Sequence, residues 1–243
     1  MLVAGFPAAA FGTNCYLLAR APGEECLVVD PGIDVVARLD ELLEEHRLRP
    51  VAVLLTHGHI DHTFSVTPVC GARGVPAYVH PGDRAMLADP ALGLSRDMRA
   101  LLGGFEWSEP DDVRVMADGE PLRLAGLEIT VDHAPGHTPG SVMFRLPEDG
   151  RDLCLSGDVL FAGSIGRTDL PGGDHATMLA SLATKVLPLP DETVVLPGHG
   201  PRTTVGRERA SNPFLADAAA RSASAAATSP PGATSPASPF RGL

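Results

Sequence analysis

Short apolar runs rich in β-branched residues recur along the chain and predict the strands of an α/β domain. Several of them end directly in a loop that carries polar side chains. Because loops beyond the carboxyl ends of strands converge at one edge of a sheet, we expect a site there. One run should form a hairpin that turns at Ala125 and Gly126. The runs cover residues 26–30, 51–56, 76–80, 121–133, 141–146, 153–158 and 193–200.

Two segments change from the strand period to the helical period of 3.6 residues. Residues 34–48 place their valines and leucines on one face, with Asp34 in position to cap the helix. Residues 174–187 repeat this pattern, with Asp174 as the cap. The alternation of strands and helices predicts an α/β fold in a single domain.

Two further segments depart from this regular pattern. Residues 83–102 look helical but are broken by Pro90 and Gly93, so we expect an insertion over the sheet edge that could act as a lid. From residue 216 the chain is an Ala/Ser/Pro/Thr tract with few large apolar side chains. We therefore predict a folded domain over residues 1–215 and a disordered tail over 216–243.

Composition narrows the class of partner. The 243 residues carry a formal net charge of -11, and Lys185 is the sole lysine, which argues against nucleic-acid binding. No apolar run approaches the roughly 20 residues that span a bilayer, so no membrane partner is expected. Gly5, Pro7 and Gly12 interrupt the N-terminal apolar stretch, which indicates a cytoplasmic protein. The four cysteines are widely spaced, as is typical of reduced, buried thiols.

The segment THGHIDH holds three of the nine histidines and follows a predicted strand. Residues two apart in extended chain point the same way, so His57, His59 and Asp61 can share one face while Gly58 keeps the turn open. His62 enters as the chain bends. Two imidazoles suit one borderline-soft ion, and an adjacent aspartate and histidine suit a second.

Three distant residues can complete such a cluster: His137 in HAPGHTPGS, Asp158 in LSGDVLF and His199 in VLPGHGP. All three follow predicted strands. A carboxylate has two oxygens, so Asp158 can bind both ions and hold them about 3.5 to 4 Å apart. A lone loop histidine is usually solvated, but five histidines and two aspartates in four strand-end loops favour a metal site.

These motifs, in this order, resemble the metallo-β-lactamase superfamily over roughly residues 2–210. The resemblance implies an αβ/βα sandwich of two facing mixed sheets with outer helices and the site at one edge. It also implies a ligand set: His57, His59 and His137 for the first metal, Asp61, His62 and His199 for the second, and Asp158 as the bridge.

Within that superfamily the run from Gly166 to Asp174, GRTDLPGGD, is similar to short glyoxalase II-like thioester hydrolases. The lactamases usually carry cysteine or serine at the position of Asp158 and are exported, and the nuclease members have basic surfaces or further domains. Glyoxalase II proper has a C-terminal helical domain that holds glutathione, whereas 44 residues follow His199 here. The resemblance therefore implies an S-acylated, hydroxyacyl-type thioester of a low-molecular-weight thiol as the substrate, but leaves the thiol open.

The implied mechanism is attack on the thioester by a hydroxide between two Zn²⁺ ions, with Asp61 and Asp158 as catalytic carboxylates and Asp61 orienting the nucleophile. Iron or manganese, and mixed or single occupancy, are the alternatives for the metal. Polar groups at strand ends can fix the tautomers of the ligand imidazoles. The candidates, at even odds with simple caps or turns, are Asp30, Thr56 and Ser156.

Arg167 has two possible roles: it can bind an anionic substrate group, or it can tie its own loop to Asp169 or Asp174. The second role is favoured because loop arginines commonly pair locally.

Three other functions remain open from the sequence. A persulfide dioxygenase would hold a single iron with His57, His137 and Asp158, which are all present. A hydrolase of another ester or lactone would use the same residues. A binding module of this fold would have lost ligands, and all seven positions are filled. The oligomeric state is not indicated.

Overall fold

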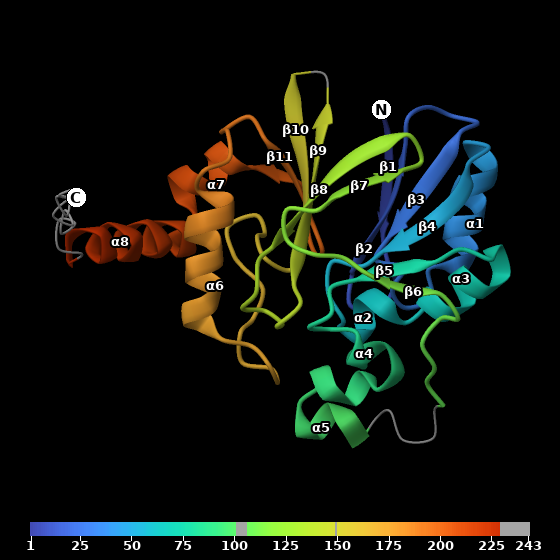
Figure 1. The fold of residues 1–243 in the computed structure, drawn as a ribbon, viewed down its shortest axis with the longest axis horizontal. Helices are drawn as coiled ribbons and strands as arrows, with labels where there is room; N and C mark the ends of the chain where they lie inside the picture. Colours follow the sequence, from blue (N-terminus) through green and yellow to red (C-terminus); the bar gives the residue numbers. More distant parts are fainter. Residues whose placement is uncertain (101–105, 149, 229–243) are drawn as a thin grey trace, which may run out of the picture.

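The computed structural model describes residues 1–100, 106–148 and 150–228. Two six-stranded sheets face one another, and helices cover their outer faces (Figure 1). This arrangement confirms the predicted sandwich of two mixed sheets in a single domain. Each predicted apolar run coincides with a strand or, for residues 121–133, with a hairpin.

The first sheet comes from the N-terminal half of the chain. Its first three strands pair antiparallel, and the pairs from β3 to β6 are parallel. The helices α1 (Val36–Glu45) and α3 (Val66–Arg73) lie on its outer face. In sheet order the strands are β1 (Leu2–Pro7), β2 (Asn14–Ala19), β3 (Glu25–Val29), β4 (Arg49–Leu54), β5 (Ala77–Val79) and β6 (Val113–Val115).

The second sheet comes from the C-terminal half and is antiparallel except for the pair β10 and β11. Its outer face packs against α6 (His175–Ser181), which continues as a π-helical turn over Leu182–Val186. The helix α7 (Val205–Ser211) follows the last strand. The strands are β7 (Pro121–Leu124), β8 (Leu127–His133), β9 (Val142–Glu148), β10 (Arg151–Gly157), β11 (Val194–Pro197) and β12 (Thr203–Thr204).

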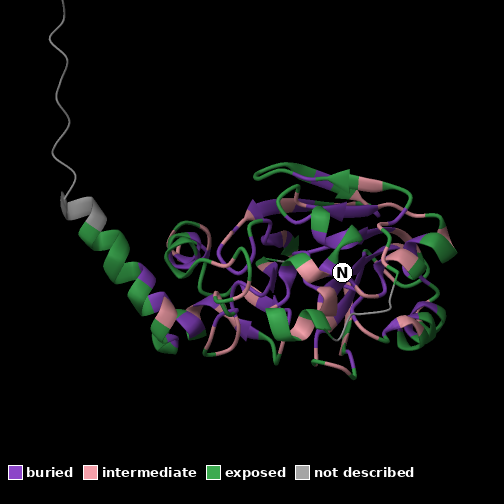
Figure 2. Ribbon diagram, turned by 90° about the horizontal axis from the view of Figure 1, so that it is seen from below, coloured by how far each residue is buried: buried purple, intermediate pink, exposed green. Residues whose placement is uncertain are grey.

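The space between the sheets is filled by the alternate, inward-facing side chains of both. Leu54 of the first sheet and Phe144 of the second are fully buried in this cluster. Figure 2 shows buried residues concentrated in the strands and exposed ones on the outer faces. Two further apolar clusters lie under the helices on either side. The four cysteines are buried, as predicted, and none is bonded to another.

The predicted hairpin turn and one of the two predicted helix caps are confirmed, and the other cap is not. Ala125 and Gly126 have φ of 50° and 67° and turn the predicted hairpin between β7 and β8. Asp174 caps α6 by accepting a hydrogen bond from the backbone N–H of Thr177 (2.6 Å). The prediction that Asp34 caps the first helix was wrong. Asp34 has φ of 56°, outside the range of a capping residue, and the helix begins one residue later than that cap would require.

The predicted insertion is a set of short helical pieces beside α2 (Ile60–Thr63). They are α4 (Ala85–Ala88), a 3₁₀ turn over Pro90–Gly93 and α5 (Arg96–Arg99). Residues 101 and 102 of the predicted insertion lie outside the described residues. Its suggested role as a lid stays a prediction.

The predicted boundary of the disordered tail at residue 216 was wrong. A helix, α8 (Pro213–Thr228), runs across it and projects from the body of the molecule. Leu215 and Ala218 are buried in the apolar cluster beneath α6, and this contact stabilises the first turns of the helix. The alanine-rich tract that follows continues the helix, because alanine has the highest helix propensity. Residues 229–243 lie outside the described residues. None of the helices described is both long and apolar enough to cross a membrane.

Candidate metal centre

The structure brings all seven predicted ligand residues to one edge of the sandwich, where the loops of both sheets meet. His57 and His59 follow β4, and Asp61 and His62 belong to α2, which lies at the same edge (Figure 1). The second sheet contributes the loops after β8, β10 and β11. In chain order the residues are His57, His59, Asp61, His62, His137, Asp158 and His199.

The first group consists of three buried imidazoles. His137 Nε2 lies 2.8 Å from His59 Nδ1 and 3.2 Å from His57 Nε2. A neutral imidazole nitrogen either donates one hydrogen or accepts through one lone pair, so His137 Nε2 cannot form good hydrogen bonds with both rings at once. Nitrogens bound to one tetrahedral zinc at about 2.0 to 2.1 Å lie about 3.3 Å apart, so this spacing fits a shared cation.

The second group is His62, His199 and Asp61. The two Nε2 atoms lie 3.2 Å apart. Asp61 Oδ2 is 3.2 Å from His199 Nε2 and 3.6 Å from His62 Nε2. His62 is fully buried, whereas about a quarter of the His199 side chain is exposed, so the centre opens to solvent on the side of the second group.

Asp158 lies between the two groups. Its Oδ1 is 3.4 Å from His62 Nε2, and its Oδ2 is 3.5 Å from His137 Nε2 and 3.6 Å from His199 Nε2. Oδ1 is buried and has no hydrogen-bond partner among the described residues. A buried carboxylate oxygen without a hydrogen bond is costly, and a bound cation would satisfy it. The residues present therefore fit a pair of divalent ions.

The surroundings shift the pKa values of His57 and His59 in one direction and that of His62 in the other. Burial, and then the neighbouring His62, hold the pKa of His57 well below its usual value. Burial and His137 lower the pKa of His59 to about 3. Burial alone would lower the pKa of His62 as well, but the nearby carboxylates, Asp61 first, raise it to about 10. His57 and His59 thus offer neutral nitrogens, as metal ligands need, while the carboxylates beside His62 favour its charged form.

Two predicted supporting residues lie behind these ligands. Asp30 Oδ2 lies 2.9 Å from His62 Nδ1 and accepts from Thr56 Oγ1 (2.6 Å), and its Oδ1 accepts from Thr56 N–H (2.8 Å). Thr56 Oγ1 lies 3.1 Å from His57 Nδ1. Asp30 therefore directs His62 Nε2 into the cluster and fixes the Thr56 hydroxyl beside His57.

The prediction that Ser156 supports a ligand imidazole was wrong. Ser156 is fully buried, but its hydroxyl donates to the backbone oxygen of Leu160 (2.8 Å) instead of facing an imidazole. Ser156 shares the outer face of β10 with Cys154, whereas the chain turns at Gly157, which has φ of 48°, before it reaches Asp158.

Two backbone carbonyls that the sequence did not indicate complete the support. His137 Nδ1 lies 2.7 Å from Arg167 O, and His199 Nδ1 lies 3.1 Å from Phe11 O. The Thr13 hydroxyl also donates to Asp61 Oδ2 (3.0 Å). Each contact joins segments far apart in the sequence, and a carbonyl carries no signature in residue type.

The Arg167 side chain pairs with Asp169, with N···O distances of 2.7 and 2.8 Å, and both side chains are mostly exposed. This is the loop-tying arrangement that the sequence favoured. We expect Arg167→Gln to change KM by less than about twofold, because an exposed pair is screened by solvent. Steady-state kinetics on the hydrolysed substrate would measure this. A tenfold rise in KM with unchanged kcat would instead mean that Arg167 binds substrate.

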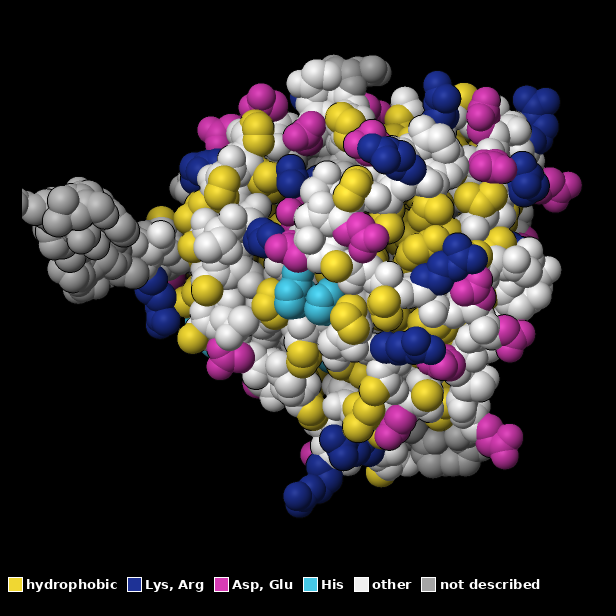
Figure 3. Space-filling view, in the orientation of Figure 1, with side chains coloured by type: hydrophobic (Ala, Val, Ile, Leu, Met, Phe, Trp, Pro, Cys, Tyr) yellow, Lys and Arg dark blue, Asp and Glu magenta, His cyan; other side chains and the backbone are white. Residues whose placement is uncertain are grey.

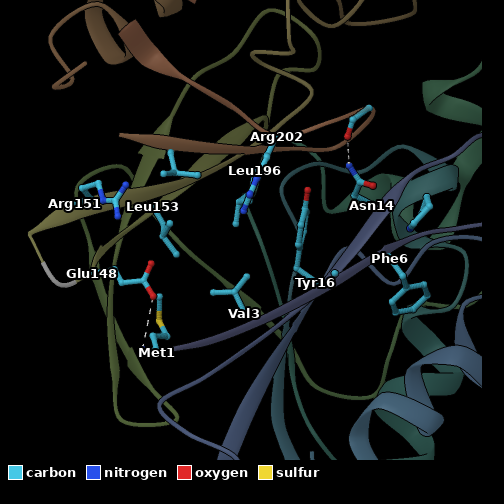
Figure 4. A pocket seen from close by; sticks show the side chains of 14 residues that line it. Met1, Val3, Phe6, Asn14, Tyr16, Glu148, Arg151, Leu153, Leu196 and Arg202 are labelled. Atoms are coloured by element: carbon cyan, nitrogen blue, oxygen red, sulfur yellow. Dashed lines mark hydrogen bonds and ion pairs between the residues drawn. The ribbon is translucent and has the colours of Figure 1, made fainter. Parts of the chain in front are cut away.

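Two other histidines and a surface groove lie apart from the seven-residue ligand cluster. His80 and His133 stack on one another with ring centroids 4.0 Å apart, and neither belongs to a possible ligand group in the described part of the chain. Histidine side chains reach the surface near the centre of the face in Figure 3, where acidic and basic side chains are interspersed. A groove of about 710 Å³ runs beside β1, with Tyr16 and Arg202 in its lining (Figure 4). None of the seven residues lines that groove.

Comparison with known proteins finds chains that are similar in sequence and in fold. Hydroxyacylglutathione hydrolase GloC of Haemophilus influenzae is 37% identical over 209 residues, which cover 86% of this chain and 95% of that protein. The solved structure of BLEG-1 B3 metallo-β-lactamase matches with a TM-score of 0.77 and 39% identity over 88% of this chain and 99% of its own. TTHA1623 in a di-iron-bound form matches with a TM-score of 0.72 and 40% identity, over 87% and 100% respectively.

The family model for the metallo-β-lactamase superfamily matches residues 8–199, which include every residue of the cluster. With two facing sheets, a histidine and aspartate cluster at one edge and this match, the chain belongs to the metallo-β-lactamase superfamily and is a metal-dependent hydrolase of that superfamily.

Proposed function

We propose that the protein is a binuclear thioester hydrolase, similar to glyoxalase II, that cleaves an S-acylated low-molecular-weight thiol. The observation that carries the binuclear part is the position of Asp158 between the groups: Oδ1 lies 3.4 Å from His62 of the second group, and Oδ2 lies 3.5 Å from His137 of the first and 3.6 Å from His199 of the second. The thioester part is supported by the run from Gly166 to Asp174 and by the likeness to GloC. His57, His59 and His137 would hold one ion, Asp61, His62 and His199 the other, and Asp158 both.

When bound, two divalent ions acidify a shared water toward neutrality and polarise the thioester carbonyl. The chain's own contribution is orientation. Asp61 Oδ2 is held by the Thr13 hydroxyl, so this carboxylate has a fixed direction beside the open side of the centre. There it can accept a hydrogen bond from the attacking water and keep it aimed at the carbonyl. Asp30 keeps the His62 ring from rotating as charge develops.

We propose zinc as the metal at both positions, because histidine nitrogens and carboxylate oxygens in these numbers suit that ion. Iron and manganese accept the same ligands, and the di-iron form of TTHA1623 makes iron the first alternative. From the acidic composition we propose a protein that acts on small molecules rather than on nucleic acid or membranes, and from its widely spaced cysteines we propose a cytoplasmic one.

A second candidate is a persulfide dioxygenase with one iron. It is favoured by the adjacency of His57, His137 and Asp158, because His137 Nε2 lies within 3.5 Å of both other side chains. Two histidines and one carboxylate with open positions are the ligand set of many non-haem iron oxygenases. This candidate gives no role to Asp61 and His199, which lie 3.2 Å apart in the second group.

The test of the proposed activity is a substrate panel with one readout for each reaction. Thiol release is measured from S-lactoyl esters of glutathione and of other small thiols, oxygen uptake is measured with a persulfide, and ring opening with a β-lactam and a lactone. We expect thiol release to exceed the other activities and to differ between carrier thiols. Oxygen uptake without thiol release would establish the dioxygenase, and ring opening alone would establish the broader hydrolase.

A further inference from the structure

Asp83 is a fully buried carboxylate that the sequence analysis did not single out. It lies in the turn between β5 and α4, and each of its oxygens accepts a short hydrogen bond. Oδ2 accepts from the backbone N–H of Gly58 (2.8 Å) and from Thr138 Oγ1 (2.6 Å), and Oδ1 accepts from the backbone N–H of Gly140 (2.7 Å). Three donors from two distant loops therefore converge on one side chain.

Those donors are the chain neighbours of the first ligand group. Gly58 lies between His57 and His59, and Thr138 directly follows His137. The loop after β4 and the loop between β8 and β9 come from different sheets. Asp83 thus links the two segments that must stay in register for the three imidazoles to face one point.

The glycines show how closely the loops approach this carboxylate. A Cβ on Gly140 would lie 2.6 Å from Asp83 Cγ, and a Cβ on Gly58 would lie 3.0 Å from both Cβ and the backbone oxygen of Asp83. Side chains at either position would push the loops apart. The missing Cβ atoms let both backbone N–H groups reach the carboxylate directly.

The turn that carries Asp83 is itself fixed. The N–H of Asp83 donates to His80 O (3.0 Å), and the N–H of Met86 donates to Asp83 O (2.9 Å). The His80 ring stacks on His133, at the end of β8, with ring centroids 4.0 Å apart. The carboxylate is therefore held from its own backbone, as a rigid anchor requires.

We propose that Asp83 is a positioning residue for the first metal site: it holds His57, His59 and His137 in ligating geometry through the backbone and through Thr138. Hydrogen bonds to a carboxylate are roughly twice as strong as neutral ones, so this link is stiffer than a pair of amides would make it. Asp30 differs from Asp83, because it contacts His62 of the second group directly and reaches His57 of the first group through Thr56. The inference rests on the proposed binuclear site, but on no particular substrate.

The test is the release of metal from the loaded, full-length protein to an excess of chromogenic chelator. Two sites of unequal affinity should release their ions in two phases. Asp83→Asn keeps the size of the side chain but replaces one acceptor oxygen with an NH₂ group that faces N–H or O–H donors. We expect it to accelerate one phase about 10- to 100-fold. The other phase should keep the wild-type rate.

Two further sets of variants separate positioning from stability. Thr138→Val removes the hydroxyl that bonds Asp83 and should accelerate the same phase as Asp83→Asn, whereas Thr138→Ser keeps it and should release metal at the wild-type rate. Glu208 is a similarly buried carboxylate, with donors from Gly163, Thr203 and Asn212. Glu208→Gln should lower the midpoint of urea unfolding and leave both phases unchanged.

The inference is overturned if Asp83→Asn releases both ions at wild-type rates. It is also overturned if Asp83→Asn accelerates both phases equally, because equal acceleration is the effect of a loosened fold and not of one displaced ligand group. A wild-type protein that holds fewer than two ions would instead contradict the binuclear site of the proposed function. The two failures are thus distinguishable in one experiment.

Discussion

Asp158→Ala is expected to release both metals and to lower kcat/KM by more than about a thousandfold. Asp158 lies between the two ligand groups, within 3.4 to 3.6 Å of three imidazoles. Its loss removes a ligand from each ion and the negative charge between them, and metal polarisation contributes several kcal/mol to such reactions. Elemental analysis and thiol-release kinetics on the same sample would measure both effects.

The fold should survive this change, because Oδ1 has no hydrogen-bond partner among the described residues and no backbone donor is left unpaired with it. The metal-free variant should unfold at the urea concentration of the metal-free wild type. Asp40→Ala, an exposed aspartate that pairs with Arg73 on the outer helices, is the matched control and should keep both ions and full turnover. If Asp158→Ala kept two ions, Asp158 would not be the bridge.

Phe144→Ala is expected to lower the free energy of unfolding by about 3 to 5 kcal/mol. Phe144 lies on β9 and is fully buried between the sheets, so truncation leaves a cavity that two hydrogen-bonded sheets cannot close. Urea unfolding of the metal-free protein, followed by circular dichroism, gives the value. The measurement excludes the contribution of bound metal to stability.

Phe11→Ala is the matched control, since this side chain is 66% exposed on the loop before β2. It should change the free energy of unfolding by less than about 0.5 kcal/mol. Equal losses for both variants would mean that Phe144 is not enclosed, and that the interior between the sheets is not the main source of stability.

The ligand cluster was predictable because each member follows a recognisable strand. His57 and His59 come directly after the run that forms β4, and Asp158 and His199 come after β10 and β11. Strand ends in a two-sheet fold converge at one edge, so the pattern of apolar runs alone placed these side chains close together. Their spacing and types then indicated metal.

The support behind the ligands was only partly predictable. Asp30 and Thr56 are polar side chains at strand ends and could be named, but Ser156 has the same description and faces the other way. The carbonyls of Phe11 and Arg167, which lie beside two of the ligand imidazoles, depend on how distant loops pack. Tertiary register decides these contacts, and residue type does not record it.

The start of the first helix and the structure of the tail could not be predicted, because each depends on tertiary contacts or backbone conformation as well as on residue preference. The alanine-rich tract after residue 216 has a composition typical of disorder, yet it also has high helix propensity. Contact of Leu215 and Ala218 with the cluster beneath α6 decides between the two. Asp34 likewise matches the residue preference of a helix cap, but its backbone adopts φ of 56° in a turn.

We propose that one chain holds two metal ions through seven side chains and uses them for hydrolysis. The most direct test is the metal content of the purified full-length protein, measured together with thiol release from an S-lactoyl thiol on the same sample. We predict about two ions per chain, with thiol release that falls as a chelator removes them and returns when metal is restored. A single iron per chain, with oxygen uptake and no thiol release, would contradict the account.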